Sequence, residues 1–225
     1  MRHSVFSCIG AALLALCSAA NATTFTFDTD PFAGLNVKNI PGRQIVGGED
    51  FVSFSIAHDV FSMDATAFGV QGPVHFVDSL SANLPAGGVN VIVLQDSDND
   101  ANPLTPFGAG NAADLIASRT TIAGPGFFVY FNQSLDLPRL VYSTDLSSSN
   151  ADLRILARML NLMGQQGRNA LPTFTAANFE ITAPTTAAPE PSSSLTTAVG
   201  GTLIAGACIL RRRRSHRRGQ AHGSV

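Results

Sequence analysis

An acidic stretch near the middle of the chain contains the side chains best suited to bind a metal ion. Asp96, Asp98 and Asp100 alternate with uncharged polar residues in the stretch DSDNDAN. Carboxylates at alternating positions of a loop can turn inward together, and a hard divalent cation such as Ca²⁺ then relieves their mutual repulsion. The stretch therefore predicts either a calcium site or a solvated Asp/Asn turn, and the sequence leaves both interpretations open.

A comparison with the EF-hand loop limits the strength of such a site. The stretch resembles the start of a D-x-D-x-D calcium loop, but Ala101 replaces the turn glycine, and Phe107 stands where the bidentate glutamate belongs. A calcium ion would need further oxygen ligands, for which Asn102 and Asp114 are candidates. No cofactor other than calcium is predicted.

The rest of the chain offers no recognisable catalytic constellation. His58 and His75 are the only histidines between residues 23 and 191, and no G-x-S-x-G, H-E-x-x-H or paired Cys/His pattern accompanies them. We therefore expect a protein that is not an enzyme. A secreted hydrolase that uses one of these histidines with a serine and an aspartate is an alternative.

Short apolar or alternating stretches, separated by Gly, Pro, Asn and Ser, predict the elements that position these residues. Polar and apolar residues alternate in 24–27 and 51–57, whereas 89–94 and 127–131 are apolar at nearly every position, as in strands covered on both faces. Further predicted strands are 67–70, 74–77, 140–142 and 178–182. The pattern indicates a mainly β fold, an antiparallel β-sandwich or jelly-roll-like domain.

One segment, 150–163, has the periodicity of a helix. Leu156 and Leu160 fall on one apolar stripe, and Arg154 and Arg158 share a narrow polar face. We expect one amphipathic helix that packs on the sheet as part of the core. A stripe that binds a partner is the alternative.

The N-terminus predicts a secretory signal peptide over residues 1–22. A basic start precedes a short apolar run, and Ala20 and Ala22 occupy the −3 and −1 positions of a signal peptidase site. We expect signal peptidase to cleave after Ala22. The mature protein then begins at Thr23, after export across the inner membrane.

The C-terminus divides into a linker at 183–194, an uncharged segment at 195–210 and a basic tail at 211–225. The basic tail begins with the cluster Arg211, Arg212, Arg213 and Arg214. A helix over the uncharged segment would be about 24 Å long, which is the short limit for a hydrocarbon layer of about 30 Å. We expect a weak transmembrane helix with a cytoplasmic tail, so that the β-rich domain at 23–182 lies on the opposite side.

The order of these C-terminal features carries a family resemblance. Pro189, Glu190 and Pro191 form a PEP tripeptide, followed by a serine spacer, the uncharged segment and the arginine cluster. This tail resembles the PEP-CTERM sorting signal of exported bacterial proteins. The resemblance implies a transient stay in the inner membrane, cleavage by an exosortase-like membrane protease, and transfer to the cell surface or the extracellular matrix. An ordinary single-pass anchor is the alternative.

Composition bounds what the domain can bind. Residues 23–191 contain all 16 acidic residues but seven of the 14 basic ones, a net charge near −9, and all three cysteines lie outside this range. Such an acidic domain does not suit nucleic acid or an anionic membrane surface. We predict a structural or binding protein of the biofilm matrix, and a calcium-assisted module that binds exopolysaccharide is the alternative.

Overall fold

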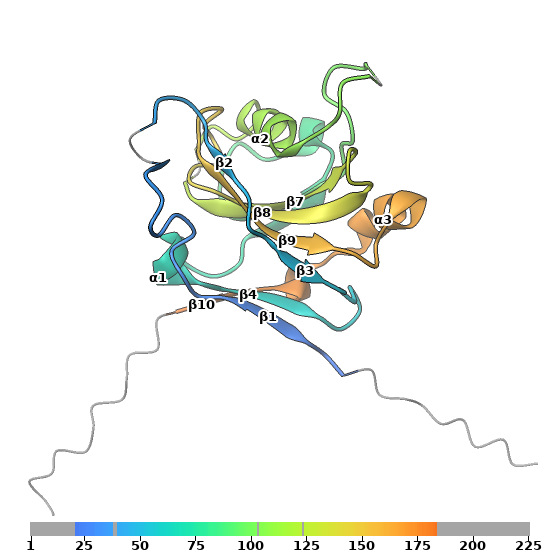
Figure 1. Cartoon of the computed structure of the whole chain (residues 1–225), viewed down its shortest axis with the longest axis horizontal. Helices are drawn as coiled ribbons and strands as arrows, with labels where there is room; N and C mark the ends of the chain where they lie inside the picture. The colour runs from blue at the N-terminus through green and yellow to red at the C-terminus, as the bar shows by residue number, and fades with distance from the viewer. Residues whose placement is uncertain (1–20, 38–39, 103, 123, 184–225) are drawn as a thin grey trace, which may run out of the picture. The chain divides into compact units, whose positions relative to one another are not determined.

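The computed structural model describes residues 21–37, 40–102, 104–122 and 124–183 (Figure 1). Several predicted features lie outside the described residues: most of the signal peptide, including Ala20, the PEP tripeptide at 189–191, the segment 195–210 and the arginine cluster at 211–214. Within the described ranges, no helix is long and apolar enough to cross a membrane.

A small sheet contains the first and the last strand of the described chain. β1 (Thr24–Phe27) and β10 (Phe179–Thr182) flank β4 (Val60–Asp64), and both pair with it in parallel. The register places Phe25 of β1 opposite Phe61 of β4. The two ends of the domain are therefore held by the same central strand.

A larger sheet forms the middle layer of the domain. Its order is β2-β9-β8-β7-β6-β5, and β3 also pairs with β9. Only β7–β8 and β8–β9 are antiparallel among the pairs of the described strands; the others are parallel. The strands are β2 (Ile45–Val46), β3 (Asp50–Val52), β5 (Phe76–Ser79), β6 (Val91–Leu94), β7 (Gly126–Asn132), β8 (Leu137–Ser143) and β9 (Leu153–Met159).

Short helices occupy the connections. The α-helices are α1 (Ala65–Phe68), α2 (Ala109–Ala117) and α3 (Gly164–Ala170). The 3₁₀ helices are η2 (Ser81–Asn83), η3 (Leu171–Thr173) and η4 (Ala176–Asn178).

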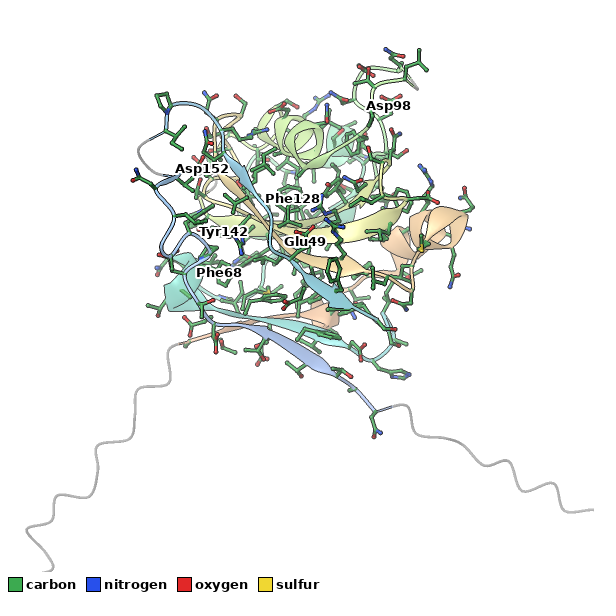
Figure 2. All side chains as sticks on the ribbon, viewed as in Figure 1. Glu49, Phe68, Asp98, Phe128, Tyr142 and Asp152 are labelled. Carbon is green, nitrogen blue, oxygen red and sulfur yellow. The ribbon has the colours of Figure 1, made fainter. Side chains whose placement is uncertain are left out.

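The layers enclose two hydrophobic cores, one on each face of the large sheet. In Figure 1, α2 lies over one face and the small sheet lies against the other. Figure 2 shows Phe128 on the α2 side of the large sheet, and Phe68 and Tyr142 on the side of the small sheet. The core between the sheets includes Phe54, Phe61, Met63, Phe127, Val129, Phe131 and Leu140. The core under α2 includes Ile92, Leu94, Ala112, Ile116, Phe128, Tyr130 and Val141.

The prediction of a mainly β fold is confirmed, but the prediction of an antiparallel sandwich or jelly roll is wrong about strand direction. Parallel strands need long crossover connections, and α2 lies in such a connection between β6 and β7. All four residues of β6 are buried, as expected for a parallel strand covered on both faces. The crossover helix is short and rich in alanine, so its local pattern was a weak guide to the topology.

The amphipathic helix predicted at 150–163 is also wrong, because half of this segment is strand β9 and none of it is helical. Arg154 and Arg158 are four residues apart, a spacing that places side chains on one face of a helix but also on one face of a strand. A β-bulge beside Leu140 and Val141 then shifts the register, so the two arginines of β9 lie opposite Tyr142 and Arg139 of β8. Pairing on both sides of β9 thus overrides the local periodicity.

The segment predicted as a strand at 51–57 leaves the sheet after Val52. The backbone of Phe54 does not pair with a neighbouring strand. The side chain of Asn161 takes the place of one, because it accepts from Phe54 N at 2.8 Å and donates to Phe54 O at 3.0 Å. The run at 67–70 forms no strand either: it contains the last two residues of α1, which Asp64 caps and which ends at Gly69 with a φ of 64°.

Candidate functional site

The aspartates of the acidic loop accept hydrogen bonds from nearby backbone N–H groups. Asp96 turns toward η2, where its carboxylate accepts from the backbone N and the Oγ of Ser81 at 2.5 and 3.0 Å. Asp98 Oδ1 accepts from Asp100 N at 3.0 Å, and Asp100 Oδ1 accepts from Asn102 N at 2.9 Å. Figure 2 shows Asp98 on a loop that projects away from the sheets. These are the contacts of a polar Asp/Asn turn.

The carboxylates that calcium would need are not gathered in one place. Asp114, a candidate additional ligand, pairs instead with Arg43 at 3.0 Å. In the part of the chain that the structure describes, no group of three or more His, Cys, Asp or Glu side chains is arranged to hold a metal ion. The solvated turn is therefore the interpretation that the geometry favours.

The two histidines lie on separate exposed segments, His58 before β4 and His75 before β5. Asp59, which follows His58, is buried and accepts hydrogen bonds from two backbone N–H groups. The backbone N of His75 donates to Asn90 Oδ1 at 2.7 Å. These contacts position the backbone and assemble no Ser-His-Asp arrangement.

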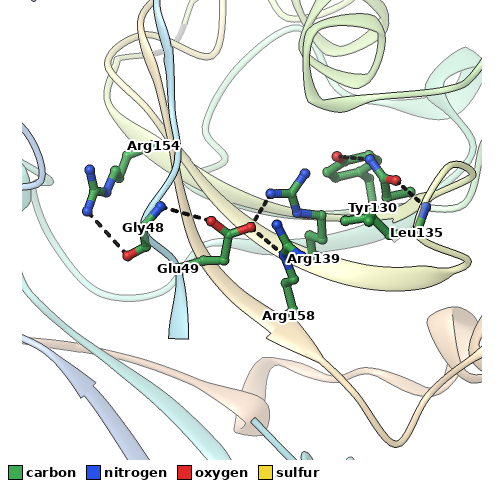
Figure 3. A network of polar contacts seen from close by, with 8 residues as sticks. Gly48, Glu49, Tyr130, Leu135, Arg139, Arg154 and Arg158 are labelled. Atoms are coloured by element: carbon green, nitrogen blue, oxygen red, sulfur yellow. Dashed lines mark hydrogen bonds and ion pairs between the residues drawn. The ribbon is translucent and has the colours of Figure 1, made fainter. Parts of the chain in front are cut away.

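Glu49, Arg139 and Arg158 form a cluster in which one buried carboxylate makes ion pairs with two arginines (Figure 3). Glu49 follows Gly48 in the connection from β2 to β3, and its side chain is 5% exposed. Its Oε1 accepts from Arg139 Nη2 at 2.5 Å and from Arg158 Nε, while its Oε2 accepts from Gly48 N at 2.9 Å. The cluster therefore fixes this connection against β8 and β9.

Electrostatics keep the Glu49 carboxylate ionised. Burial alone would raise its pKa, but hydrogen bonds from its own backbone amide, Arg158 and Arg139 outweigh burial and lower the pKa from 4.5 to about 2. The Arg158 guanidinium also lies 5.3 Å from the centre of the Phe51 ring, a cation–π distance. Two guanidiniums thus share one carboxylate, and the cluster retains a positive charge.

Beside this cluster lies a cavity of about 410 Å³. Gly48 connects the two, because its carbonyl accepts from Arg154 Nη2 at 3.4 Å while its N–H donates to Glu49 (Figure 3). The cavity lining combines charged and apolar side chains from β1, the loop after it, β3, α1 and β9. It includes Phe27, Asp30, Leu35, Asp50, Phe68 and Arg154.

Tyr142 contacts Phe68, one of the residues that line the cavity. Their rings make an edge contact at 4.9 Å, and the Tyr142 hydroxyl donates to Phe68 O at 2.7 Å. Burial, assisted by the negative charge of Asp30, raises the pKa of Tyr142 to about 12. The phenol therefore stays protonated and keeps its role as a donor.

Sequence reasoning missed Glu49 and Arg139 and placed Arg154 and Arg158 on the narrow polar face of a helix. A signal was available, because charged residues inside an apolar run are expected to be paired. The partner was not identifiable, since Glu49 is 90 or more residues from both arginines that it binds. Comparisons with family models, with curated proteins and with solved structures give no match for this chain.

We predict that Glu49 makes stability depend on pH in the acid range. Because its folded-state pKa lies below the unfolded value, its contribution is present above about pH 4.5 and is lost as the pH falls toward 2; it amounts to about 3 kcal/mol. Urea unfolding at pH 7 and pH 3 should show this loss. Glu49→Gln should be destabilised at pH 7 and lack this part of the slope, whereas Glu180→Gln, at an exposed carboxylate on β10, should keep it.

We also predict that calcium leaves the melting temperature unchanged. A folded-state site filled at 100 times its Kd would add about 2.7 kcal/mol, which thermal unfolding detects readily. Here the carboxylates of the acidic loop already accept backbone hydrogen bonds. An increase at millimolar Ca²⁺ that disappears in Asp98→Asn would contradict this expectation and restore the calcium site.

Proposed function

We propose that this chain is an exported, non-enzymatic protein of the bacterial cell surface or extracellular matrix. A signal peptide delivers its β-rich domain, and a PEP-CTERM tail sorts it through an exosortase-like protease. The proposal rests on the sequence signals at the two ends. The structure supports it mainly through the positions of the first and the last strand, which both lie between those signals.

The ends of the fold leave room for processing at both termini. β1 begins at Thr24, two residues after Ala22, and β10 ends at Thr182, before the linker with the PEP tripeptide. Cleavage after Ala22 and near the tripeptide would therefore leave both outer strands of the small sheet complete. A cut after Thr24, or a cut before Thr182, would remove part of a strand.

The domain does not need disulfide bonds to be stable outside the cytoplasm. No cysteine lies between residues 23 and 182. Two hydrophobic cores hold the layers together instead, and the buried Glu49 cluster joins the β2–β3 connection to β8 and β9 within the large sheet. The stability of the exported domain would then be independent of the redox conditions that it meets.

A second candidate function, binding of exopolysaccharide, is favoured by the cavity next to Arg154. Sugar hydroxyls suit a pocket that combines a guanidinium and carboxylates with apolar surface such as Phe27. Arg154 donates to Gly48 O at 3.4 Å, a contact that holds its guanidinium beside the cavity. This version of the hypothesis needs no calcium.

We predict that the native surface protein begins at Thr23 and ends upstream of Arg211. Intact mass spectrometry of the protein released from cells reads both ends at once. Glu190→Ala with Pro191→Ala should leave the tail attached and the protein in the membrane, whereas Thr185→Ala with Thr186→Ala, in the same linker, should not. A native protein that still ends at Val225 would refute the sorting proposal.

We predict that Arg154→Ala weakens retention on matrix polysaccharide by about tenfold, as expected for loss of a charged hydrogen-bond donor. Affinity electrophoresis with the purified matrix polysaccharide, and with dextran as an uncharged comparison, measures the effect. Arg119→Ala is the matched control, because Arg119 is exposed after α2 and does not line the cavity. Equal retention of both variants would exclude this cavity as the binding site.

A further inference from the structure

A buried carboxylate lies at the predicted new N-terminus of the domain. Asp59 is 5% exposed in the turn before β4. Its Oδ1 accepts from the backbone N of Thr23 at 2.8 Å, and its Oδ2 accepts from Ser55 N at 2.8 Å. Thr23 follows Ala22, the residue after which signal peptidase is expected to cut.

We propose that Asp59 is a binding site for the α-ammonium group that cleavage creates on Thr23. Hydrolysis of the Ala22–Thr23 bond adds one water: the new carboxylate leaves with Ala22, and the nitrogen of Thr23 gains protons to become –NH₃⁺. The same nitrogen that donated as a peptide N–H then faces Asp59 as a cation. Processing thereby converts a neutral hydrogen bond into an ion pair, an inference that rests on the proposed export.

The surroundings hold both partners in place. Thr23 O accepts from Val60 N at 3.0 Å, so residue 23 is fixed through its nitrogen and through its carbonyl. On the other side, Asn178 Nδ2 donates to Asp59 O at 3.0 Å and to Ile56 O at 2.7 Å. Asn178 is itself 3% exposed and precedes β10. The turn that carries Asp59 is therefore held by residues that precede both neighbours of β4, Thr23 before β1 and Asn178 before β10.

The charge balance of this turn favours a cationic partner. The ion pairs found among the described residues use the carboxylates of Glu49, Asp114 and Asp136, and none of them uses Asp59. A buried carboxylate that meets only neutral donors is costly, and a nearby cation offsets that cost. An ammonium at Thr23 supplies that missing charge without any change of fold.

The expected pH dependence has a definite sign. The carboxylate raises the pKa of the α-amino group above its free value of about 7.7–8.0, so the added stability is present below that pH and is lost as the pH rises through the raised pKa. His58 is the titratable neighbour in the same turn. Asp64 lies at the far end of β4, and Glu180 of β10 pairs opposite Ser62. A His58→Gln background separates histidine titration from that of the amine.

The sequence allows a selective test, because Lys38 is the only lysine of the chain. In a Lys38→Arg chain that runs from Thr23 to Val225, purified in detergent, amine acetylation modifies the α-amino group alone. We expect the free amine to melt about 3–6 °C higher than the acetylated chain at pH 7. A chain that begins at Asn21 should melt like the acetylated one. The difference should vanish above about pH 10, where the amine is neutral.

Asp59→Asn provides the matched side-chain variant, and it should melt at the same temperature with and without acetylation. If this variant does not fold, acetylation and the two-residue extension still test the proposal with every side chain of the fold intact. Equal melting of free and acetylated chains at pH 7, or a difference that persists above pH 10, would overturn it. A native protein that begins elsewhere would instead refute the export step, because the engineered chain starts at Thr23 regardless.

Discussion

Burial of the central strands on both faces is the constraint on which the rest of the structure depends. Every residue of β6 and β7 is buried, so each face of the large sheet needs a covering layer. α2 covers one face with alanine and isoleucine, and the aromatic side chains of the small sheet cover the other. Because the small sheet is built from the first, the central and the last strands of the domain, the core closes only when both ends of the chain are in place.

Ion pairs stabilise the edge of the large sheet that β2 and β3 form beside β9. β2 and β3 are short and interrupted by Gly47, Gly48 and Glu49, so they contribute few ladder bonds. Glu49 compensates by joining this edge to Arg139 of β8 and Arg158 of β9. The same interruption leaves room for the cavity beside Arg154. One irregular connection therefore both stabilises the sheet edge and shapes the strongest candidate binding surface.

How much was predictable from sequence depended on whether the signal was local. The strands at 24–27 and 127–131 and the β-rich class followed from alternation and from apolar runs. Strand direction did not, because an apolar run such as β6 has no local mark of the direction of its neighbours. β9 was mistaken for a helix because the spacing of four between its two arginines fits a helix, and the bulge that interrupts strand alternation here has no local mark in the sequence. At the site, the acidic loop was visible in the sequence, but the Glu49 cluster depends on contacts between residues far apart in the chain, which no local pattern encodes.

The small sheet has a mechanical consequence. β1 enters at one end of β4 and β10, parallel to it, leaves at the other end, so a pull on the two ends of the domain runs along the strands. Such tension loads the ladder bonds on both sides of β4 together, in shear, instead of opening them one by one from an end. A domain tethered through β10 alone would carry drag on its body through the β10–β4 bonds, again in shear.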